Sequence, residues 1–285
     1  MSKVRKSRNG KDGNKRPSAP LPGSFGLKHF LWVAGLACAG GSFLTWAVIP
    51  PSNIKSTVQA HSSAGRSVWE LLALPDAELE KVDVLEMNLA VAKGIPGLEK
   101  LDYSHYRQIV DDWTEQFRRE LAATEPRFYQ SPGEWRNDIN FFRLGLLCTY
   151  LTRERGIGYI EKYSQDQKQG RNSKYQSPEA LLLHGLIDTQ HGTCANMPVL
   201  HVVIGRRMGW PVSLACVGPH YVCRYDDGKV HYNIEATYTG PGFVSDSDEE
   251  YMQHDHLPKI ALASGSDFRS LSAREMMGCF LCARA

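Results

Sequence analysis

The sequence predicts an α+β fold in which a helical first half precedes a compact unit of one helix and three antiparallel strands. Between residues 83 and 153, apolar side chains recur at helical spacing in successive segments. Between residues 189 and 237, a helical pattern is followed by short apolar runs separated by Gly-Trp-Pro, Gly-Pro and Asp-Asp-Gly turns. Helices and strands therefore segregate along the chain, as in α+β domains.

The composition limits the classes of function. The chain has 285 residues, of which 42% are hydrophobic, enough for one sizeable core. The net charge of +2 is too near neutral to indicate nucleic-acid binding. The sequence contains no glycine-rich phosphate-binding loop, so it does not indicate a nucleotide-binding site. We therefore expect no nucleic-acid partner. The basic surplus lies at the N-terminus, where seven basic residues accompany only Asp12: Lys3, Arg5, Lys6, Arg8, Lys11, Lys15 and Arg16.

The N-terminal 67 residues predict a membrane anchor. Residues 1–24 are basic and rich in Gly, Pro and Ser, which predicts a disordered tail. Residues 25–49 carry their only charge at Lys28 and include about twenty apolar residues, the length of a transmembrane helix. A cleaved signal peptide is the alternative. The positive-inside rule puts the N-terminus in the cytoplasm and the globular part outside, in the periplasm if the source is bacterial. Residues 50–67 form the predicted linker.

Residues 68–176 predict a helical region. Helices are expected over 83–92, 103–123 and 137–153, where apolar residues share one helical face. In the second helix this stripe comprises Ile109, Trp113, Phe117 and Leu121. Residues 156–176 are polar and are expected to form an exposed loop beside the functional site.

Residues 177–285 predict the core that carries the chemistry. One helix begins at Ser177 and reaches the vicinity of Gln190, and a final helix over 272–284 begins with a capping box of Ser272 and Glu275. The segment 238–265 is expected to cross near the mouth of the site. Between these parts we expect a helix over 195–208 and strands over 211–217, 220–225 and 229–235.

Three residues of this core suggest thiol catalysis. Cys194 falls in the predicted first helical turn, where backbone N–H groups and the helix dipole favour a thiolate. His220 opens the second strand, and Glu235 lies at the end of the third, with Asn233 on the same face. A thiol nucleophile needs a histidine to take its proton and a third group to orient the imidazole. Either Glu235 or Asn233 fits that third role.

The segments GTCANMPVLHVVIGRRMGWP, GPHYVCRY and NIEAT resemble the transglutaminase-like superfamily, including bacterial proteins of the SirB type. The resemblance covers residues 177–285 and implies a papain-like cysteine-enzyme core with Cys194 as nucleophile, His220 as base and Glu235 as orienter. Many members carry aspartate where this chain has Glu235, which keeps Asn233 as a substitute. Papain-like proteases share the order, but their histidine lies much further from the cysteine.

The resemblance implies thiol-dependent acyl transfer on, or hydrolysis of, an amide in a peptide or protein. This chemistry requires no external cofactor. The alternative is a catalytically inactive, membrane-tethered module that binds a peptide or protein. The sequence does not indicate an oligomeric state.

Other residues compete for these roles. Gln190 and the Cys194 amide are candidate oxyanion donors, since acyl transfer builds negative charge on the carbonyl oxygen. His191 and His231 are alternative bases. His254-Asp255-His256 lacks a second ligand pair and is expected on a solvated loop, so no metal site is predicted.

Two cysteine pairs invite a redox interpretation. Cys279 and Cys282 form a C-x-x-C within a predicted helix, where core packing competes with a redox role. If the first two strands pair around Gly218-Pro219, Cys216 lies opposite Tyr221 and only diagonal to Cys223. That separation is too long for an easy disulfide.

Overall fold

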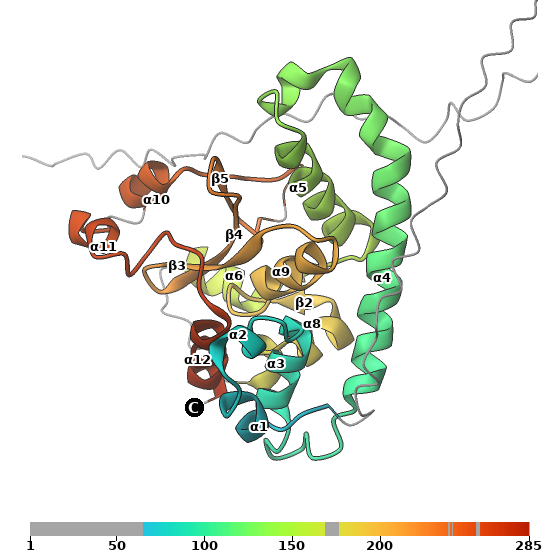
Figure 1. Ribbon diagram of the computed structural model, residues 1–285, viewed down its shortest axis with the longest axis vertical. Helices are drawn as coiled ribbons and strands as arrows, with labels where there is room; N and C mark the ends of the chain where they lie inside the picture. Colours follow the sequence, from blue (N-terminus) through green and yellow to red (C-terminus); the bar gives the residue numbers. More distant parts are fainter. Residues whose placement is uncertain (1–64, 169–176, 239, 241, 255–256, 285) are drawn as a thin grey trace, which may run out of the picture.

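The computed structural model describes residues 65–168, 177–238, 240, 242–254 and 257–284 (Figure 1). The predicted basic tail, the predicted membrane helix and most of the predicted linker lie outside these ranges. Within the ranges, no helix is both long and apolar enough to span a bilayer.

Helices and a small sheet together give the predicted α+β architecture. The α-helices are α1 (Val68–Leu72), α2 (Asp76–Leu79), α3 (Val84–Ala92), α4 (Tyr103–Thr124), α5 (Ile139–Thr149), α6 (Glu161–Lys168), α7 (Pro178–Leu181), α8 (Leu183–Thr189), α9 (Met197–Arg207), α10 (Asp248–His254), α11 (Lys259–Ala263) and α12 (Ala273–Arg284). The other helical segments are the 3-10 helices η1 (Glu125–Gln130) and η2 (Pro132–Trp135) and the π-helical turn η3 (Tyr150–Glu154). The strands are β1 (Gly158–Tyr159), β2 (His191–Gly192), β3 (Val212–Val217), β4 (His220–Asp226) and β5 (His231–Ile234).

The three long helices predicted in the first half are present, and aspartate caps each of them. Asp83, Asp102 and Asp138 precede α3, α4 and α5, and each side chain accepts a hydrogen bond from the backbone N–H two residues further on. These caps satisfy backbone donors that have no partner inside the helix. The third predicted helix continues beyond α5 as the π-helical turn η3.

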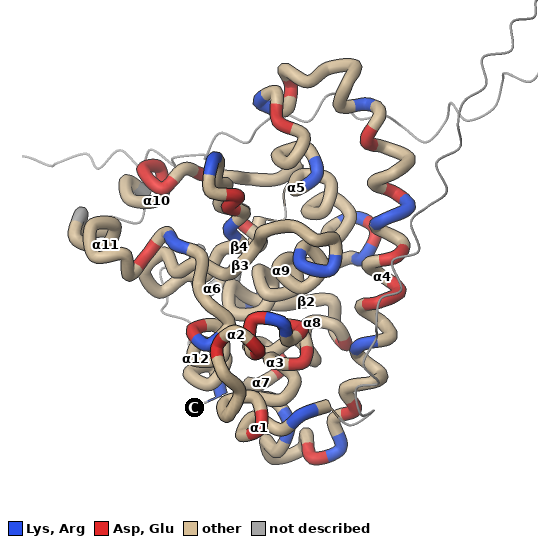
Figure 2. The backbone as a smooth tube through the Cα atoms, viewed as in Figure 1, with Lys and Arg blue, Asp and Glu red and all other residues tan. Residues whose placement is uncertain are grey.

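Helix α4 forms one side of the molecule, as Figure 1 shows. Of its predicted apolar stripe, Phe117 and Leu121 are buried, and Ile109 and Trp113 are partly buried against the core. Lys, Arg, Asp and Glu residues are distributed along the length of α4 (Figure 2). The stripe therefore serves packing, and the charged face stays in solvent.

The prediction of a loop over residues 156–176 is wrong for residues 158–168, which form a short strand and a helix. β1 pairs in parallel with β2, and helix α6 follows directly. The N–H of Gly158 donates to the carbonyl of Gln190 at 2.9 Å, and that of Ile160 donates to Gly192 at 2.9 Å. A pairing between segments so far apart in sequence leaves no local pattern that could predict it. Residues 169–176 lie outside the described residues.

The single helix predicted from Ser177 is two short helices, α7 and α8. The chain breaks between them because Leu182 is extended, with φ −118° and ψ 159°. The N–H of Leu183 donates to the Asn88 side chain of α3 at 2.8 Å. A Cβ at Gly185 would collide with the backbone of Glu179, so glycine is needed where the two helices fold together. A distant side chain and a close backbone contact thus break the local helical pattern.

The sheet that carries the predicted site residues is antiparallel, in the order β3-β4-β5. The register places Cys216 opposite Tyr221 and Leu214 opposite Cys223. The predicted hairpin pairing is therefore confirmed. β3 is an edge strand of this sheet, and the segment before α12 covers it, since Leu271 N–H donates to the carbonyl of Leu214 at 2.8 Å.

Two hydrophobic clusters cover the two faces of this sheet. The larger one joins α3, α4, α8, α9 and α12 to alternate strand residues such as Leu214, Cys223 and Ile234. The smaller one takes the opposite positions of β3 and β4, including Val217 and Val222, and adds Tyr251 and Phe268 from later segments. Both the predicted helical region and the predicted core contribute to the larger cluster.

Candidate active site

Cys194 lies in the turn that leads into α9. The helix itself begins at Met197, two residues later than the sequence predicts. The N–H groups of Asn196 and Met197 both donate to the carbonyl of Thr193, at 3.3 and 3.0 Å, so the chain already curls helically before the helix. Cys194 therefore stands at the positive end of the α9 dipole, where negative charge is favoured.

Two fully buried polar residues hold this turn in shape. The Asn196 side chain accepts a hydrogen bond from the Thr193 N–H at 2.8 Å, and the Thr193 hydroxyl accepts one from the Ala195 N–H at 3.1 Å. The pattern is similar to a capping box, except that the Thr193 hydroxyl bonds the N–H two residues further on and not three, and that asparagine replaces the usual acid or glutamine. The two side chains flank Cys194 in the sequence and limit the backbone conformations open to it.

The same two side chains fasten the turn to α7. The Thr193 hydroxyl donates to the carbonyl of Ala180 at 2.7 Å. The Asn196 amide donates to the carbonyls of Glu179 and Leu182, at 3.3 and 3.1 Å. These carbonyls lie at or just beyond the end of a short helix, where few helical N–H groups can reach them, and the Leu182 carbonyl also accepts a long backbone bond, from Leu186 at 3.5 Å. The position of Cys194 thus depends on a neighbouring helix.

His220 opens β4, and its ring reaches both other members of the predicted triad. Its Nε2 lies 2.8 Å from the carboxylate oxygen Oε2 of Glu235. A hydrogen bond also joins the His220 ring to Cys194. An ionised carboxylate only accepts hydrogen bonds, so Nε2 carries a proton and Nδ1 is the nitrogen left to exchange one with the thiol.

Glu235 follows β5 directly and is buried, with 6% of its surface exposed. Its other oxygen, Oε1, accepts hydrogen bonds from the N–H of Thr237, at 3.0 Å, and from the Thr237 hydroxyl. The Tyr251 hydroxyl donates to Oε2 at 3.1 Å. Burial raises the pKa of Glu235, but the bonds from His220 and Thr237 outweigh it and lower the pKa to about 2.

The environment of His220 favours its protonated form. Burial lowers the pKa of the imidazole, but hydrogen bonds and negative charge from Cys194 and Glu235 outweigh it and raise the pKa to about 10. A proton that leaves the thiol is therefore held firmly on the ring. The part of this shift that comes from Cys194 is lost when the sulfur bonds to a carbonyl carbon, and the imidazolium can then release the proton to the leaving amine.

Asn233 is not the partner of His220. It pairs with Arg224 on the neighbouring strand, and its side-chain oxygen accepts from that guanidinium at 2.6 Å. Its amide nitrogen donates to the Asp248 carboxylate at 2.6 Å. The two strand positions share a face, as predicted, but a buried ion pair occupies Asn233.

The other sequence candidates lie in different surroundings. Gln190 ends α8 in a left-handed conformation, is exposed, and has its side-chain oxygen near Gly156. His191 is exposed, and its Nδ1 lies 2.8 Å from the carbonyl of Thr189. His231 lies 3.4 Å from the Asp248 carboxylate. None of these contacts involves Cys194.

The sequence analysis did not identify four residues that support the site: Thr193, Asn196, Thr237 and Tyr251. Tyr251 belongs to α10, within the predicted segment 238–265, and reaches Glu235 across the smaller cluster. The T-x-x-N pattern of Thr193 and Asn196 is a capping signal, but its partners on α7 cannot be read locally. Of Tyr251 the sequence holds no signal beyond its place near the expected mouth of the site.

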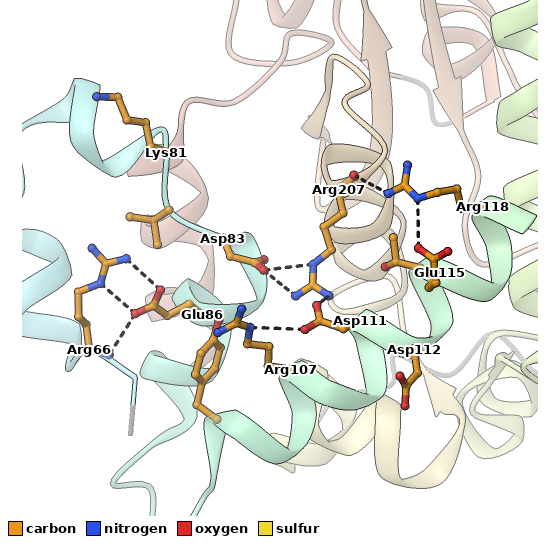
Figure 3. A pocket seen from close by; sticks show the side chains of 13 residues that line it. Arg66, Lys81, Asp83, Glu86, Arg107, Asp111, Asp112, Glu115, Arg118 and Arg207 are labelled. Atoms are coloured by element: carbon orange, nitrogen blue, oxygen red, sulfur yellow. Dashed lines mark hydrogen bonds and ion pairs between the residues drawn. The ribbon is translucent and has the colours of Figure 1, made fainter. Parts of the chain in front are cut away.

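A cavity of about 580 Å³ lies elsewhere, between α3, α4 and the end of α9 (Figure 3). Ion pairs line it. Arg207 contacts Asp83 and Asp111, at 2.6 and 2.8 Å, and Arg66 contacts Glu86 at 2.9 Å. Cys194, His220 and Glu235 are not among its lining residues. The opposed charges in it already pair with one another, so we interpret the cavity as a solvated seam between helices.

Metal ligation has no support from the described part of the chain, where no group of three or more His, Cys, Asp or Glu side chains is arranged to hold an ion. In the His254-Asp255-His256 motif, residues 255 and 256 fall outside the described residues.

Comparison with known proteins identifies the family. A family model of the transglutaminase-like superfamily matches residues 104–281, and so extends well ahead of the cysteine and histidine motifs into α4. Searches of curated proteins and of solved structures found no match. The match covers more than half of the chain and includes Cys194, His220 and Glu235. The chain therefore belongs to the transglutaminase-like superfamily.

Proposed function

We propose that this protein catalyses thiol-dependent acyl transfer from a peptide or protein amide, with Cys194 as nucleophile, His220 as general acid and base, and Glu235 as the group that orients the imidazole. One observation carries the proposal. A buried carboxylate, an imidazole and a thiol are hydrogen-bonded in series. The superfamily as a whole supports the same class of chemistry.

The reaction divides into two halves. Nδ1 of His220 takes the thiol proton as the sulfur of Cys194 attacks the amide carbonyl carbon. The carbon–nitrogen bond then breaks, His220 returns the proton to the leaving amine, and the acyl group remains on the sulfur as a thioester. Water or a second amine next attacks the thioester while His220 takes its proton, and Cys194 regains a thiol proton from the imidazolium.

Glu235 supports both halves without exchanging a proton. Its low pKa keeps it ionised over the working range, so its negative charge stabilises the imidazolium that forms in each half. The bonds from Thr237 and Tyr251 hold the carboxylate in one orientation, and Nε2 of His220 stays the protonated nitrogen.

We propose further that residues 25–49 anchor the enzyme in a membrane, with the N-terminus in the cytoplasm and the globular part outside. The support is a long apolar segment, with Lys28 as its only charge, behind a basic leader. Fractionation of cells with a carbonate wash and protease accessibility of the globular part test this proposal. Release into the soluble fraction without detergent would contradict it.

The experiment that tests the catalytic proposal uses p-nitrophenyl acetate as an acyl donor, with intact-mass spectrometry of the full chain. We expect fast, hydroxylamine-labile acetylation that peptide mapping assigns to Cys194 in the wild type and that is lost in Cys194→Ala, while any acetylation of Cys279 is the same in both proteins. His220→Ala should slow acetylation by at least about a hundredfold. His191→Ala is the matched control, because this exposed histidine contacts Thr189 instead, and its acetylation rate should equal that of the wild type.

Equally fast acetylation of the wild type and Cys194→Ala, with no fast-forming acetyl group mapped to Cys194, would refute the proposal. Slow modification of Cys194 that does not respond to His220→Ala would instead favour the inactive binding module, which needs no activated thiol.

A further inference from the structure

A second pair of thiols meets where α12 packs against the edge strand β3. Cys216 of β3 and Cys279 of α12 are hydrogen-bonded to each other, and Cys279 is also hydrogen-bonded to the Tyr221 hydroxyl. Tyr221 is the direct partner of Cys216 in the register of β3 and β4. Cys279 of the helix thus contacts both members of the cross-strand pair formed by Cys216 and Tyr221.

The surrounding contacts hold α12 in this place. The N–H groups of Phe268 and Leu271 donate to carbonyls of β3, at 3.0 and 2.8 Å, and bring the chain along the strand into the helix. The hydroxyl of Ser213 on β3 contacts the sulfur of Met276 on α12 at 3.6 Å. The N–H of Phe268 bonds the carbonyl of Cys216 itself, so the segment that leads into α12 passes directly beside this cysteine. The packing of α12 and its preceding segment against β3 therefore brings the two thiols together.

We propose that Cys216 and Cys279 form a disulfide that fastens the C-terminal helix to the edge of the three-stranded sheet. Both thiols are free in this structure, and both are partly exposed, so a small oxidant can reach them. This inference does not depend on acyl transfer, because neither sulfur belongs to the proposed triad.

Cys279 is the thiol that starts the reaction. Hydrogen bonds from Cys216 and Tyr221 lower its pKa to about 6 against the opposing effect of burial, whereas the bond with Cys279 and burial raise the pKa of Cys216. The thiolate is the nucleophile in thiol–disulfide exchange.

The oxidant is a small-molecule disulfide such as oxidised glutathione. The Cys279 thiolate attacks one of its sulfurs and releases one glutathione thiolate, which leaves a mixed disulfide on the helix. Cys216 then loses its proton to solvent and attacks the Cys279 sulfur, and the second glutathione thiolate leaves. Two protein thiols are oxidised, and one disulfide is reduced to two thiols.

The other described cysteines are poorer partners. Cys282 lies three residues further along α12 and is exposed, and Cys279 forms its thiol hydrogen bond with Cys216. Cys223 lies on the adjacent strand β4, opposite Leu214, and is buried, with 1% of its surface exposed. Cys148 is buried as well. A link between β3 and α12 also closes a long loop, which is the case in which a disulfide stabilises most.

The test equilibrates the full chain with mixtures of reduced and oxidised glutathione, followed by acid quenching, alkylation and non-reducing tryptic mapping. Trypsin releases residues 208–224, with Cys216 and Cys223, and residues 275–284, with Cys279 and Cys282. We expect these peptides to appear linked, with fragment spectra that assign the bond to Cys216 and Cys279. The link should raise the thermal midpoint by a few degrees.

Three serine variants make the assignment. Cys216→Ser and Cys279→Ser should each abolish both the link and the rise in thermal midpoint, while Cys282→Ser keeps both. Equal thermal midpoints of the reduced variants and the reduced wild type show that folding is intact. A bond assigned to Cys279 and Cys282, mixed glutathione disulfides alone, or no oxidation in fully oxidised glutathione would overturn the proposal.

Discussion

Nε2 of His220 and Oε2 of Glu235 lie 2.8 Å apart, and the carboxylate is buried. A buried charge is costly unless it is paired and hydrogen-bonded. Here the imidazole, Thr237 and Tyr251 provide the partners that keep the carboxylate ionised. The pair links β4 to the residue after β5, so the sheet itself sets its geometry.

Replacing Glu235 with glutamine should lower the pKa of His220 towards 6.5, because the amide keeps a hydrogen-bond acceptor but loses the negative charge. NMR titration of ring-labelled histidine measures this shift. The rate of p-nitrophenyl acetate acylation should fall by at least about tenfold. Glu275→Gln is the control, because that carboxylate also has a lowered pKa but is paired with Arg269 on the surface. Equal His220 titration in the wild type and Glu235→Gln would contradict the assignment.

The pair should stabilise the fold most between about pH 4.5 and 6.5. The pKa of Glu235 is lowered from 4.5 to about 2, so its contribution is complete above 4.5 and is lost as the pH falls towards 2. The pKa of His220 is raised from 6.5 to about 10, so its contribution is complete below 6.5 and is lost as the pH rises towards 10. Urea unfolding of the wild type and Glu235→Gln across this range measures the difference in free energy. A difference that does not vary with pH would argue against the pairing.

Tyr251→Phe should cost about 1.5–3 kcal/mol of unfolding free energy, because it removes one hydrogen bond to the buried, ionised carboxylate. We also expect slower acylation of Cys194, since Glu235 then holds the imidazole less firmly. Tyr129→Phe is the matched control, because this tyrosine is 70% exposed, and it should change neither quantity. Chemical denaturation and acylation kinetics provide the two readouts. Wild-type values for both in Tyr251→Phe would show that Tyr251 does not position Glu235.

Asn196→Ala should destabilise the protein by on the order of 3 kcal/mol, because it leaves the buried Thr193 N–H without its partner and removes the side-chain hydrogen bonds to the carbonyls of Glu179 and Leu182. Acylation of the folded fraction should also slow, since the turn that carries Cys194 loses its anchor. Asn140→Ala, which removes only a long 3.5 Å contact with Arg143, should behave like the wild type. Undiminished acylation by folded Asn196→Ala would restrict Asn196 to stability.

Arg207→Ala should lower the unfolding free energy by about 1–2 kcal/mol without changing the acylation rate of the folded protein. Arg207 ties α9 to Asp83 and Asp111 at the cavity, away from the triad. Lys81→Ala removes an exposed ion pair with Glu78 and should cost less than about 0.5 kcal/mol. A large loss of acylation in folded Arg207→Ala would contradict this prediction and show that contacts at the cavity affect the reactivity of Cys194.

The local sequence predicted what short-range physics controls. Aspartate caps, the helical spacing of α4 and the Asp-Asp-Gly turn each act within a few residues, so the corresponding elements appear where the pattern put them. The alternation along β5 put Asn233 and Glu235 on one face, but alternation could not choose between them. The choice follows from Arg224 and Asp248, which bind Asn233 and leave Glu235 for His220.

By itself, the sequence determined the α+β order of elements and the identity of a cysteine, a histidine and two acid or amide candidates, because helical and strand periodicity and turn chemistry are local. Only the tertiary structure decided the break between α7 and α8, the β1–β2 pairing, the hydrogen bond from Tyr251 to Glu235 and the meeting of Cys216 with Cys279. Each of these joins segments that the chain brings together only when the core packs. The reactive groups can therefore be identified from the sequence, but the contacts that position them join residues far apart in the chain.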